Sequence, residues 1–298
     1  MAEDLLIEEP WTNGHLMGTF ARPAHGPARG PVALIIAGSG PTPRDGNLDT
    51  YKLIAAGLAA AGIRSLRYDK RGAGKTLLLV TREDDLVLQT FADDVVAAAA
   101  SLAKRDDVSS VILVGHSEGG TLAIMAASQT PIAGLVLLAA AGRRLDVILR
   151  EQLAAIPLPP GKEHLRAEGL AILDKLVRGE RVSDVPPEQA ALFRPSVQPF
   201  WISSFAVDPA ASLATLKVPT LIVWGESDIQ VRRSDFDALA AARPDARALA
   251  LPKANHEFKP APADITDRTA QAASYDKAAP LVPGLVPAIA DFIGSVAR

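Results

Sequence analysis

The sequence predicts an α/β fold in which a mostly parallel central sheet is flanked by helices. The first observation is that short apolar segments alternate with longer, alanine-rich amphipathic ones, as parallel strands alternate with crossover helices. The second is that some short segments are apolar throughout, such as residues 111–115 (VILVG), as expected of strands buried on both faces. The third is one long interruption of this alternation, which predicts an insertion into a single α/β core.

The expected elements of the core follow one another along the chain. We predict strands at residues 32–37, 63–68, 111–115, 135–139, 220–225 and 246–251, and helices at residues 51–61, 91–103, 121–128, 235–242 and 286–296. The order strand–helix–strand favours parallel neighbours joined by crossover helices.

The interruption covers residues 142–217, and we predict that it forms a helical cap inserted between two core strands. Residues 1–141 and 218–298 would then form the core. The segment is rich in proline and contains amphipathic pieces such as residues 165–177. Because ligand sites in such sheets lie at the carboxyl ends of the strands, a long element here is expected to cover the site. A separate small domain without contact to the site is the alternative.

Composition and charge limit the possible partners. The chain of 298 residues has a formal net charge of −3 and no cysteine, which excludes disulfides, thiolate metal sites and cysteine nucleophiles. Neither the charge nor any basic run favours nucleic acid. The first ten residues (MAEDLLIEEP) lack the features of a secretory signal, and no apolar run approaches the roughly 18 residues of a membrane span. We expect a cytoplasmic protein without cofactor or metal, whose oligomeric state the sequence leaves open.

Residues 115–119 (GHSEG) match the pattern G-x-S-x-G and predict a nucleophilic serine, Ser117. The pattern follows directly on the buried strand and precedes a helix start, which is the strand–turn–helix setting that such a nucleophile requires. The flanking glycines remove side chains that would collide in a strained turn. The serine hydroxyl is therefore expected at the edge of the sheet, with the N-terminus of a helix behind it.

A serine hydroxyl is a poor nucleophile at neutral pH and needs a base that is itself oriented by an acid. Of the five histidines, only His256 lies beyond the last predicted strands, so it is the predicted base. Asp228 follows the strand at residues 220–225 and is the predicted acid, with Glu226 as the alternative. We expect His116 to be structural, because successive side chains in a tight turn diverge.

The oxyanion of a tetrahedral intermediate needs hydrogen-bond donors. One is expected to be the backbone N–H of Glu118, the residue after the nucleophile. The other is expected from the loop after the first predicted strand, at residues 38–41 (GSGP), where small residues permit close approach of the backbone. We assign it to the N–H of Ser39, although these residues could also form no more than a tight turn.

With these motifs the chain resembles the α/β-hydrolase superfamily over nearly its whole length, most of all bacterial members with a helical cap and esterase-like activity. Residues 68–76 (YDKRGAGKT) resemble that group's D-x-R-G-x-G turn, and residues 36–47 (IAGSGPTPRDGN) resemble its oxyanion loop. The resemblance implies an α/β-hydrolase fold and the triad Ser117, Asp228 and His256. One departure bears on the first oxyanion donor, because many relatives have His-Gly where this chain has Ala37 and Gly38.

The nucleophile and the cap suggest the reaction. A serine at this turn argues against dehalogenase and epoxide hydrolase chemistry, which uses an aspartate there in proteins that resemble this one. The cap carries four aromatic residues that could line an apolar acyl pocket or only pack the cap: Phe193, Phe200, Trp201 and Phe205. We predict a carboxylesterase for small- to medium-chain acyl groups, with a thioesterase, an aminopeptidase-like hydrolase and a non-catalytic small-molecule-binding protein as alternatives.

Residues 74–76 (GKT) also invite an NTPase interpretation, because they match the end of a phosphate-binding loop. The full pattern G-x-x-x-x-G-K-[ST] requires a glycine where this chain has Asp69. The NTPase alternative is therefore weak.

Overall fold

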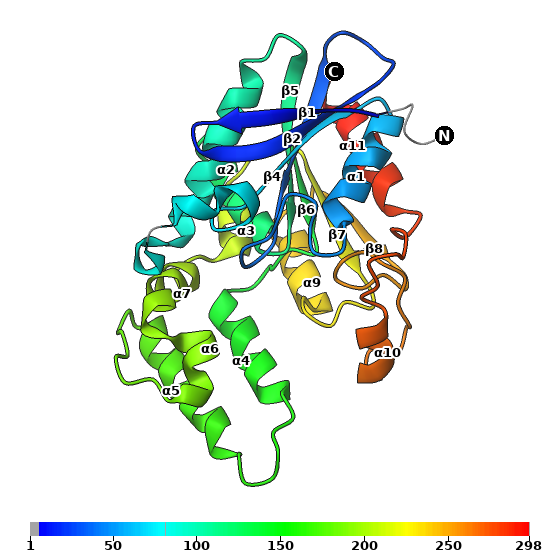
Figure 1. Ribbon diagram of the computed structural model, residues 1–298. Helices are drawn as coiled ribbons and strands as arrows, with labels where there is room; N and C mark the ends of the chain where they lie inside the picture. The colour runs from blue at the N-terminus through cyan, green and yellow to red at the C-terminus, as the bar shows by residue number, and fades with distance from the viewer. Residues whose placement is uncertain (1–5, 81, 298) are drawn as a thin grey trace.

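The computed structural model describes residues 6–80 and 82–297, and its centre is an eight-stranded sheet (Figure 1). The strands lie in the order β1-β2-β4-β3-β5-β6-β7-β8. From β4 to β8 all neighbours are parallel, whereas β2 is antiparallel to both β4 and β1. The predicted, mostly parallel sheet is thus confirmed. Its strands are β1 (Leu6–Asn13), β2 (Leu16–Pro23), β3 (Gly30–Ile36), β4 (Arg64–Tyr68), β5 (Val108–His116), β6 (Gly134–Leu138), β7 (Thr220–Gly225) and β8 (Arg247–Leu251).

The hairpin β1–β2 was not predicted from the sequence. Strand β1 has an exposed edge, and of its eight residues only Trp11 is buried. Such a strand lacks the continuous apolar run that marks the central strands. The sheet therefore begins earlier in the chain than the predicted first strand at residue 32.

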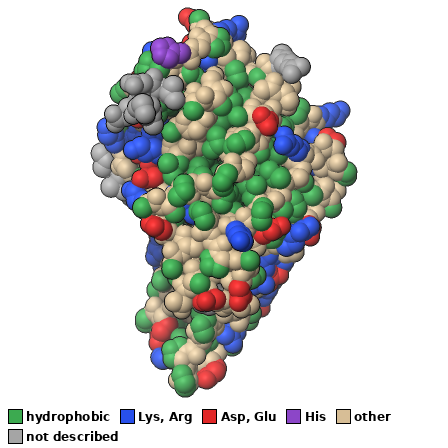
Figure 2. All heavy atoms as spheres, turned by 90° about the vertical axis from the view of Figure 1, so that its right-hand side faces the viewer, with side chains coloured by type: hydrophobic (Ala, Val, Ile, Leu, Met, Phe, Trp, Pro, Cys, Tyr) green, Lys and Arg blue, Asp and Glu red, His purple; other side chains and the backbone are tan. Residues whose placement is uncertain are grey.

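Hydrophobic clusters cover both faces of the sheet, because alternate residues of a strand point to opposite sides. In β5, Leu113 belongs to a cluster with residues of α2 (Leu88–Ala103), α3 (Glu118–Ala127) and α9 (Arg233–Ala242). Ile112 belongs to a second cluster, with residues of α1 (Thr50–Ala60) and α11 (Leu285–Val296). Figure 1 shows α2 and α3 on one side of the sheet and α1 and α11 on the other. Figure 2 shows the side of α1 and α11, where apolar side chains gather around the middle and charges of both signs are mixed.

Helices fill the segment between β6 and β7, which we call the cap segment (residues 142–217). They are α4 (Leu145–Ala155), α5 (His164–Val177), α6 (Ala190–Phe193), α7 (Gln198–Phe205) and α8 (Pro209–Ala214). In Figure 1, α4 to α7 lie together beyond one end of the sheet. They share a hydrophobic cluster of their own, whereas Leu213 of α8 belongs to a cluster of the core. The segment is helical as predicted, and its exact boundaries stay a prediction.

The parallel strands place several loops at one edge of the sheet. The loops after β3, β5, β7 and β8 all leave from carboxyl ends, which is where α/β sheets bind their ligands. Three of these loops carry the predicted Ser39, Asp228 and His256, and the turn after β5 carries Ser117. None of the helices within the described residues has the length and apolar character needed to cross a lipid bilayer.

Candidate active site

Ser117 lies in the turn between β5 and α3 and has a backbone φ of 55°. This region is strained for a residue with a side chain and is found at functional sites. The turn is tight, since a side chain on Gly115 would collide with the backbone carbonyl of Gly119, and one on Gly119 would collide with that of Ile36. The N–H of Ser117 donates to the carbonyl of Leu138 in β6 at 2.9 Å. The sheet therefore fixes the backbone from which this side chain projects.

Asp228 and His256 form a buried pair at the same edge. Their Oδ2 and Nδ1 atoms lie 2.7 Å apart, and the residues are 2% and 4% exposed. The other carboxylate oxygen of Asp228 accepts the N–H groups of Gln230 and Val231 at 2.7 and 3.0 Å. A carboxylate held in this way keeps the proton of His256 on Nδ1 and leaves Nε2 as the basic atom.

The electrostatic surroundings of His256 act in opposite directions on its pKa. Burial lowers the pKa of the imidazole, whereas the charge and hydrogen bond of Asp228 and the charge of Glu257 raise it. The net direction is upward from the ordinary value of 6.5. The alternative acid, Glu226, is exposed, and the carboxylate that contacts His256 is that of Asp228.

Ser117 and His256 line one cavity of 340 Å³. Within the described residues, no hydrogen bond joins the Ser117 hydroxyl to His256. Such bonds are often long in ligand-free enzymes and tighten when substrate binds. The structure thus brings the three predicted catalytic side chains to one place, with the acid and the base already in contact.

His116 connects this site to the neighbouring loops. Its Nε2 lies 2.9 Å from the carbonyl oxygen of His256, and its Nδ1 lies 2.9 Å from the hydroxyl of Tyr51 in α1. Because a carbonyl oxygen can only accept a hydrogen bond, His116 carries its proton on Nε2. Its Nδ1 therefore accepts a hydrogen bond from the Tyr51 hydroxyl. The Tyr51 hydroxyl in turn accepts the N–H of Gly38 at 3.0 Å.

Both side chains of this chain of hydrogen bonds are neutral. Burial lowers the pKa of His116 and raises the pKa of Tyr51. The expectation that His116 is structural agrees with these contacts. The sequence analysis did not identify Tyr51 as part of the site, because it lies 65 residues before His116 and its predicted helix gave no sign of a polar contact.

The oxyanion loop passes close to Ser117. A Cβ atom on Gly38 would lie 3.2 Å from the Cβ of Ser117, so only glycine fits without displacement. The N–H of Gly38 is occupied by Tyr51. In the described part of the chain the N–H groups of Ser39 and Glu118 donate to no other residue, and both residues line a cavity together with Ser117. They are free to bind a ligand oxygen.

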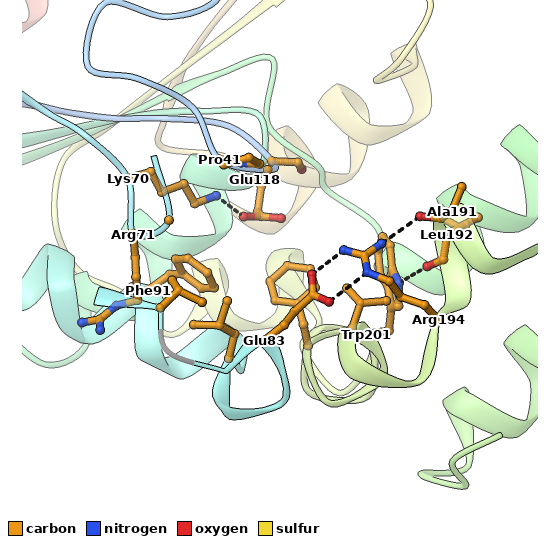
Figure 3. A pocket seen from close by; sticks show the side chains of 17 residues that line it. Pro41, Lys70, Arg71, Glu83, Phe91, Glu118, Ala191, Leu192, Arg194 and Trp201 are labelled. Carbon is orange, nitrogen blue, oxygen red and sulfur yellow. Dashed lines mark hydrogen bonds and ion pairs between the residues drawn. The ribbon is translucent and has the colours of Figure 1, made fainter. Parts of the chain in front are cut away.

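Two cavities lie between the core and the cap segment, and Ser39 and Glu118 line both of them. The larger, of 530 Å³, is lined by Phe91, Phe200 and Trp201 (Figure 3). The smaller, of 290 Å³, includes Ser117 and residues of α4. The two cavities share four lining residues, which are Ser39, Glu118, Leu192 and Trp201.

The four aromatic residues of the cap divide into two pairs. Phe200 and Trp201 line the larger cavity. Phe193 and Phe205 do not, because they are 0% and 1% exposed and belong to the hydrophobic cluster of the cap segment. For these two residues the structure supports the alternative that they pack the cap, and Phe205 supports Trp201 by stacking against it with ring centroids 5.7 Å apart.

Charged side chains around the two cavities are paired. Lys70 contacts Glu118 at 2.5 Å, Arg71 contacts Asp94 at 2.6 Å, and Arg194 is paired with Glu83. In the smaller cavity Arg143 contacts Asp235 and Glu151. Among residues 6–80 and 82–297, no three His, Asp or Glu side chains come together in a way that could hold a metal ion.

A mostly parallel sheet with a strained serine after β5 and a buried Asp–His pair after β7 and β8 defines an α/β hydrolase. Residues 22–272 match the model of the alpha/beta hydrolase family, and the chain belongs to this family.

Known proteins similar to this chain include hydrolases of several kinds. Esterase EstD from Thermotoga maritima is 32% identical over 212 residues, which are 69% of this chain but 48% of the relative, so the chain spans about half of that protein. The structure of Est1E from Butyrivibrio proteoclasticus with bound ferulic acid has a TM-score of 0.65 at 16% identity, and the match covers 97% of this chain and 98% of that one. Proline iminopeptidase from Mycobacterium smegmatis has a TM-score of 0.60 at 19% identity, with 97% and 98% covered. The two structures show likeness of fold.

Proposed function

We propose that this protein is a serine hydrolase that cleaves carboxylic esters of small to medium acyl chain length through an acyl-enzyme on Ser117. The observation that carries the proposal is the buried Asp228–His256 pair, in which His256 lines the same cavity as Ser117. The pair supplies an oriented base next to a serine in a strained turn, which is the requirement for nucleophilic catalysis. The similarity to an esterase that is 32% identical supports the same reaction.

The reaction would proceed by two acyl transfers. His256 Nε2 takes the proton of the Ser117 hydroxyl as its oxygen attacks the ester carbonyl, and the N–H groups of Ser39 and Glu118 hold the resulting oxyanion. His256 then gives the proton to the departing alkoxide, which leaves as the alcohol. Water, deprotonated by His256, attacks the acyl-enzyme in the same way and releases the acid and free Ser117.

The cavity walls favour a neutral, apolar acyl group. In the described part of the chain, each Lys or Arg that lines the two cavities beside the cap is paired with a carboxylate. No cation is left there for the phosphates of a CoA thioester. The aromatic side chains of Phe91, Phe200 and Trp201 instead offer apolar surface to an acyl chain.

A second candidate is an aminopeptidase-like hydrolase, and it is favoured by Glu257. This carboxylate lines the cavity that holds Ser117 and His256. It accepts the hydroxyl of Thr50 at 2.7 Å, and within the described residues no cation pairs with it. A substrate amine could pair with such a carboxylate.

The test is a series of initial rates on p-nitrophenyl esters from acetate to long acyl chains, with Ser117→Ala as the blank. We expect turnover with a short- to medium-chain optimum, lowered on the order of 10⁶-fold in the folded variant. Folded Ser117→Ala protein that keeps most of the activity would contradict the proposal. Turnover of alanine p-nitroanilide and of no ester would select the second candidate.

A further inference from the structure

A buried cation lies beside the oxyanion loop. Lys70 is the second residue after β4 and is 4% exposed. Its Nζ donates to the carbonyl oxygen of Gly38 at 2.7 Å and to Oε1 of Glu118 at 2.5 Å. It also lies 5.0 Å from the ring centroid of Phe91. Figure 3 shows its side chain pointing at Glu118.

The contact with Gly38 bears on the neighbouring N–H. The carbonyl of Gly38 and the N–H of Ser39 belong to one planar trans peptide unit, in which they point in opposite directions. An ammonium that holds the carbonyl on one side therefore fixes the direction of the N–H on the other side. That N–H is the first oxyanion donor of the proposed mechanism.

The contact with Glu118 bears on the second donor. Glu118 begins α3, and its own backbone N–H is the other group expected to hold the oxyanion. Its carboxylate is tied to the ammonium that holds Gly38. One buried cation thus connects the loop after β3 with the start of α3, the two elements that carry the donors.

We propose that Lys70 is a positioning residue for oxyanion stabilisation, which sets the spacing and direction of the N–H groups of Ser39 and Glu118. The inference rests on the proposed function, because it concerns the transition state of acyl transfer to Ser117. Lys70 acts through the peptide and the carboxylate that it holds. Its loss should therefore lower kcat and leave substrate binding nearly unchanged.

If Lys70 only formed a structural ion pair with Glu118, kcat and stability would fall together and recover together. Removing Lys70 alone leaves the Glu118 carboxylate buried without a partner, which destabilises the fold. Replacing Glu118 by Gln in the same protein removes that charge and should restore stability. It does not restore the contact with Gly38, so the positioning role predicts that kcat stays low while stability recovers.

The experiment compares Lys70→Met and the double variant Lys70→Met/Glu118→Gln with the wild-type protein. The readouts are kcat and KM on the best p-nitrophenyl ester, the rate of Ser117 labelling by a fluorophosphonate, and the thermal midpoint. We expect both variants to lose on the order of 10²-fold in kcat and in labelling rate, as when an oxyanion donor is removed, with little change in KM.

Arg64→Met is the matched control. Arg64 begins β4, the strand that Lys70 follows, and it is equally buried at 4% exposed. It also donates to backbone carbonyls, those of Pro27 and Ala28, but at the opposite end of the strand. Its loss should lower the thermal midpoint without lowering kcat.

Two results would overturn the inference. One is a folded Lys70→Met protein with nearly wild-type kcat and labelling rate, and the other is a double variant in which kcat recovers together with stability. If the wild-type protein hydrolyses no ester but is labelled, the proposed function fails and the labelling rates of the variants still decide the role of Lys70. A wild-type protein that is neither active nor labelled overturns both.

Discussion

Charged side chains are buried at the carboxyl edge of the sheet and exposed on the outer surface of the cap segment. At the edge, Asp228, His256 and Lys70 are 2–4% exposed, and each is bonded to the backbone or to another buried group. On the cap, an ion pair such as Arg178 with Glu180 is more than half exposed. The cap helices pack around an apolar cluster of their own.

This difference predicts which substitutions should change the activity of the protein. The buried groups at the edge are held by specific hydrogen bonds. Removing one bonded atom therefore leaves its partner without a hydrogen bond or changes which atom carries the proton. Exposed ion pairs contribute at most ~1 kcal/mol and can be replaced freely. We therefore expect changes at the edge to alter the rate of the chemistry, and changes in the cap to alter which acyl group is accepted.

The largest effect after the loss of Ser117 is expected for Asp228→Asn. The amide can donate to His256 Nδ1 and so favours the wrong tautomer, in which Nε2 carries the proton and cannot accept that of Ser117. We expect kcat to fall about 10⁴-fold in steady-state ester assays. Glu226→Gln, on the same loop but exposed, should keep wild-type rates, and a greater loss there than in Asp228→Asn would reverse the assignment of the acid.

The next effect is on stability, in Tyr51→Phe. Removing the hydroxyl leaves the buried N–H of Gly38 and Nδ1 of His116 without partners. We expect the free energy of unfolding in urea to fall by ~1–3 kcal/mol, and kcat to fall less than in Asp228→Asn. Unchanged stability would mean that this chain of hydrogen bonds does not hold the oxyanion loop.

In the cap, Trp201→Ala should change selectivity rather than chemistry. Trp201 is part of the wall shared by the two cavities beside Ser117, so its loss opens one into the other. We expect the optimum acyl length to move to longer chains, with kcat/KM on those esters changed by roughly 10-fold. Phe193→Leu is the control, because that residue is buried inside the cap, and it should lower the thermal midpoint without moving the optimum. An optimum that stays in place in Trp201→Ala would remove these cavities from the acyl site.

The smallest effect is a shift in the pH profile of Glu257→Gln. The negative charge of Glu257 contributes to raising the pKa of His256. Catalysis needs neutral His256, so activity rises with pH through that pKa, and removing the charge should move the acid limb of kcat/KM to lower pH. The measurement is kcat/KM across the acid limb, with Glu226→Gln as the charge-matched control. A shift to higher pH would contradict the sign of this interaction.

The sequence predicted most of the sheet because its central strands are buried on both faces and read as continuous apolar runs. It predicted the turn at Ser117 because glycine is the one residue that fits beside it. Strand β1 was missed because an edge strand with exposed acidic residues has no such run.

The contacts that hold the site were beyond the reach of sequence patterns. Lys70 meets Glu118 across 48 residues, and His116 meets His256 across 140, so no local periodicity reports them. The same limit applies to the cap, where Trp201 lines a cavity and Phe205 does not, although both lie in α7. Which face of a short helix points inward depends on packing that the sequence alone does not specify.

The most direct test of the account is to trap the covalent intermediate. The protein is mixed rapidly with its best p-nitrophenyl ester, quenched in acid and digested, and the peptides are analysed by mass spectrometry. The account predicts an acyl adduct on the peptide that contains residues 115–119, located on Ser117, and no adduct in Ser117→Ala. Ester turnover with an adduct on another residue would contradict it.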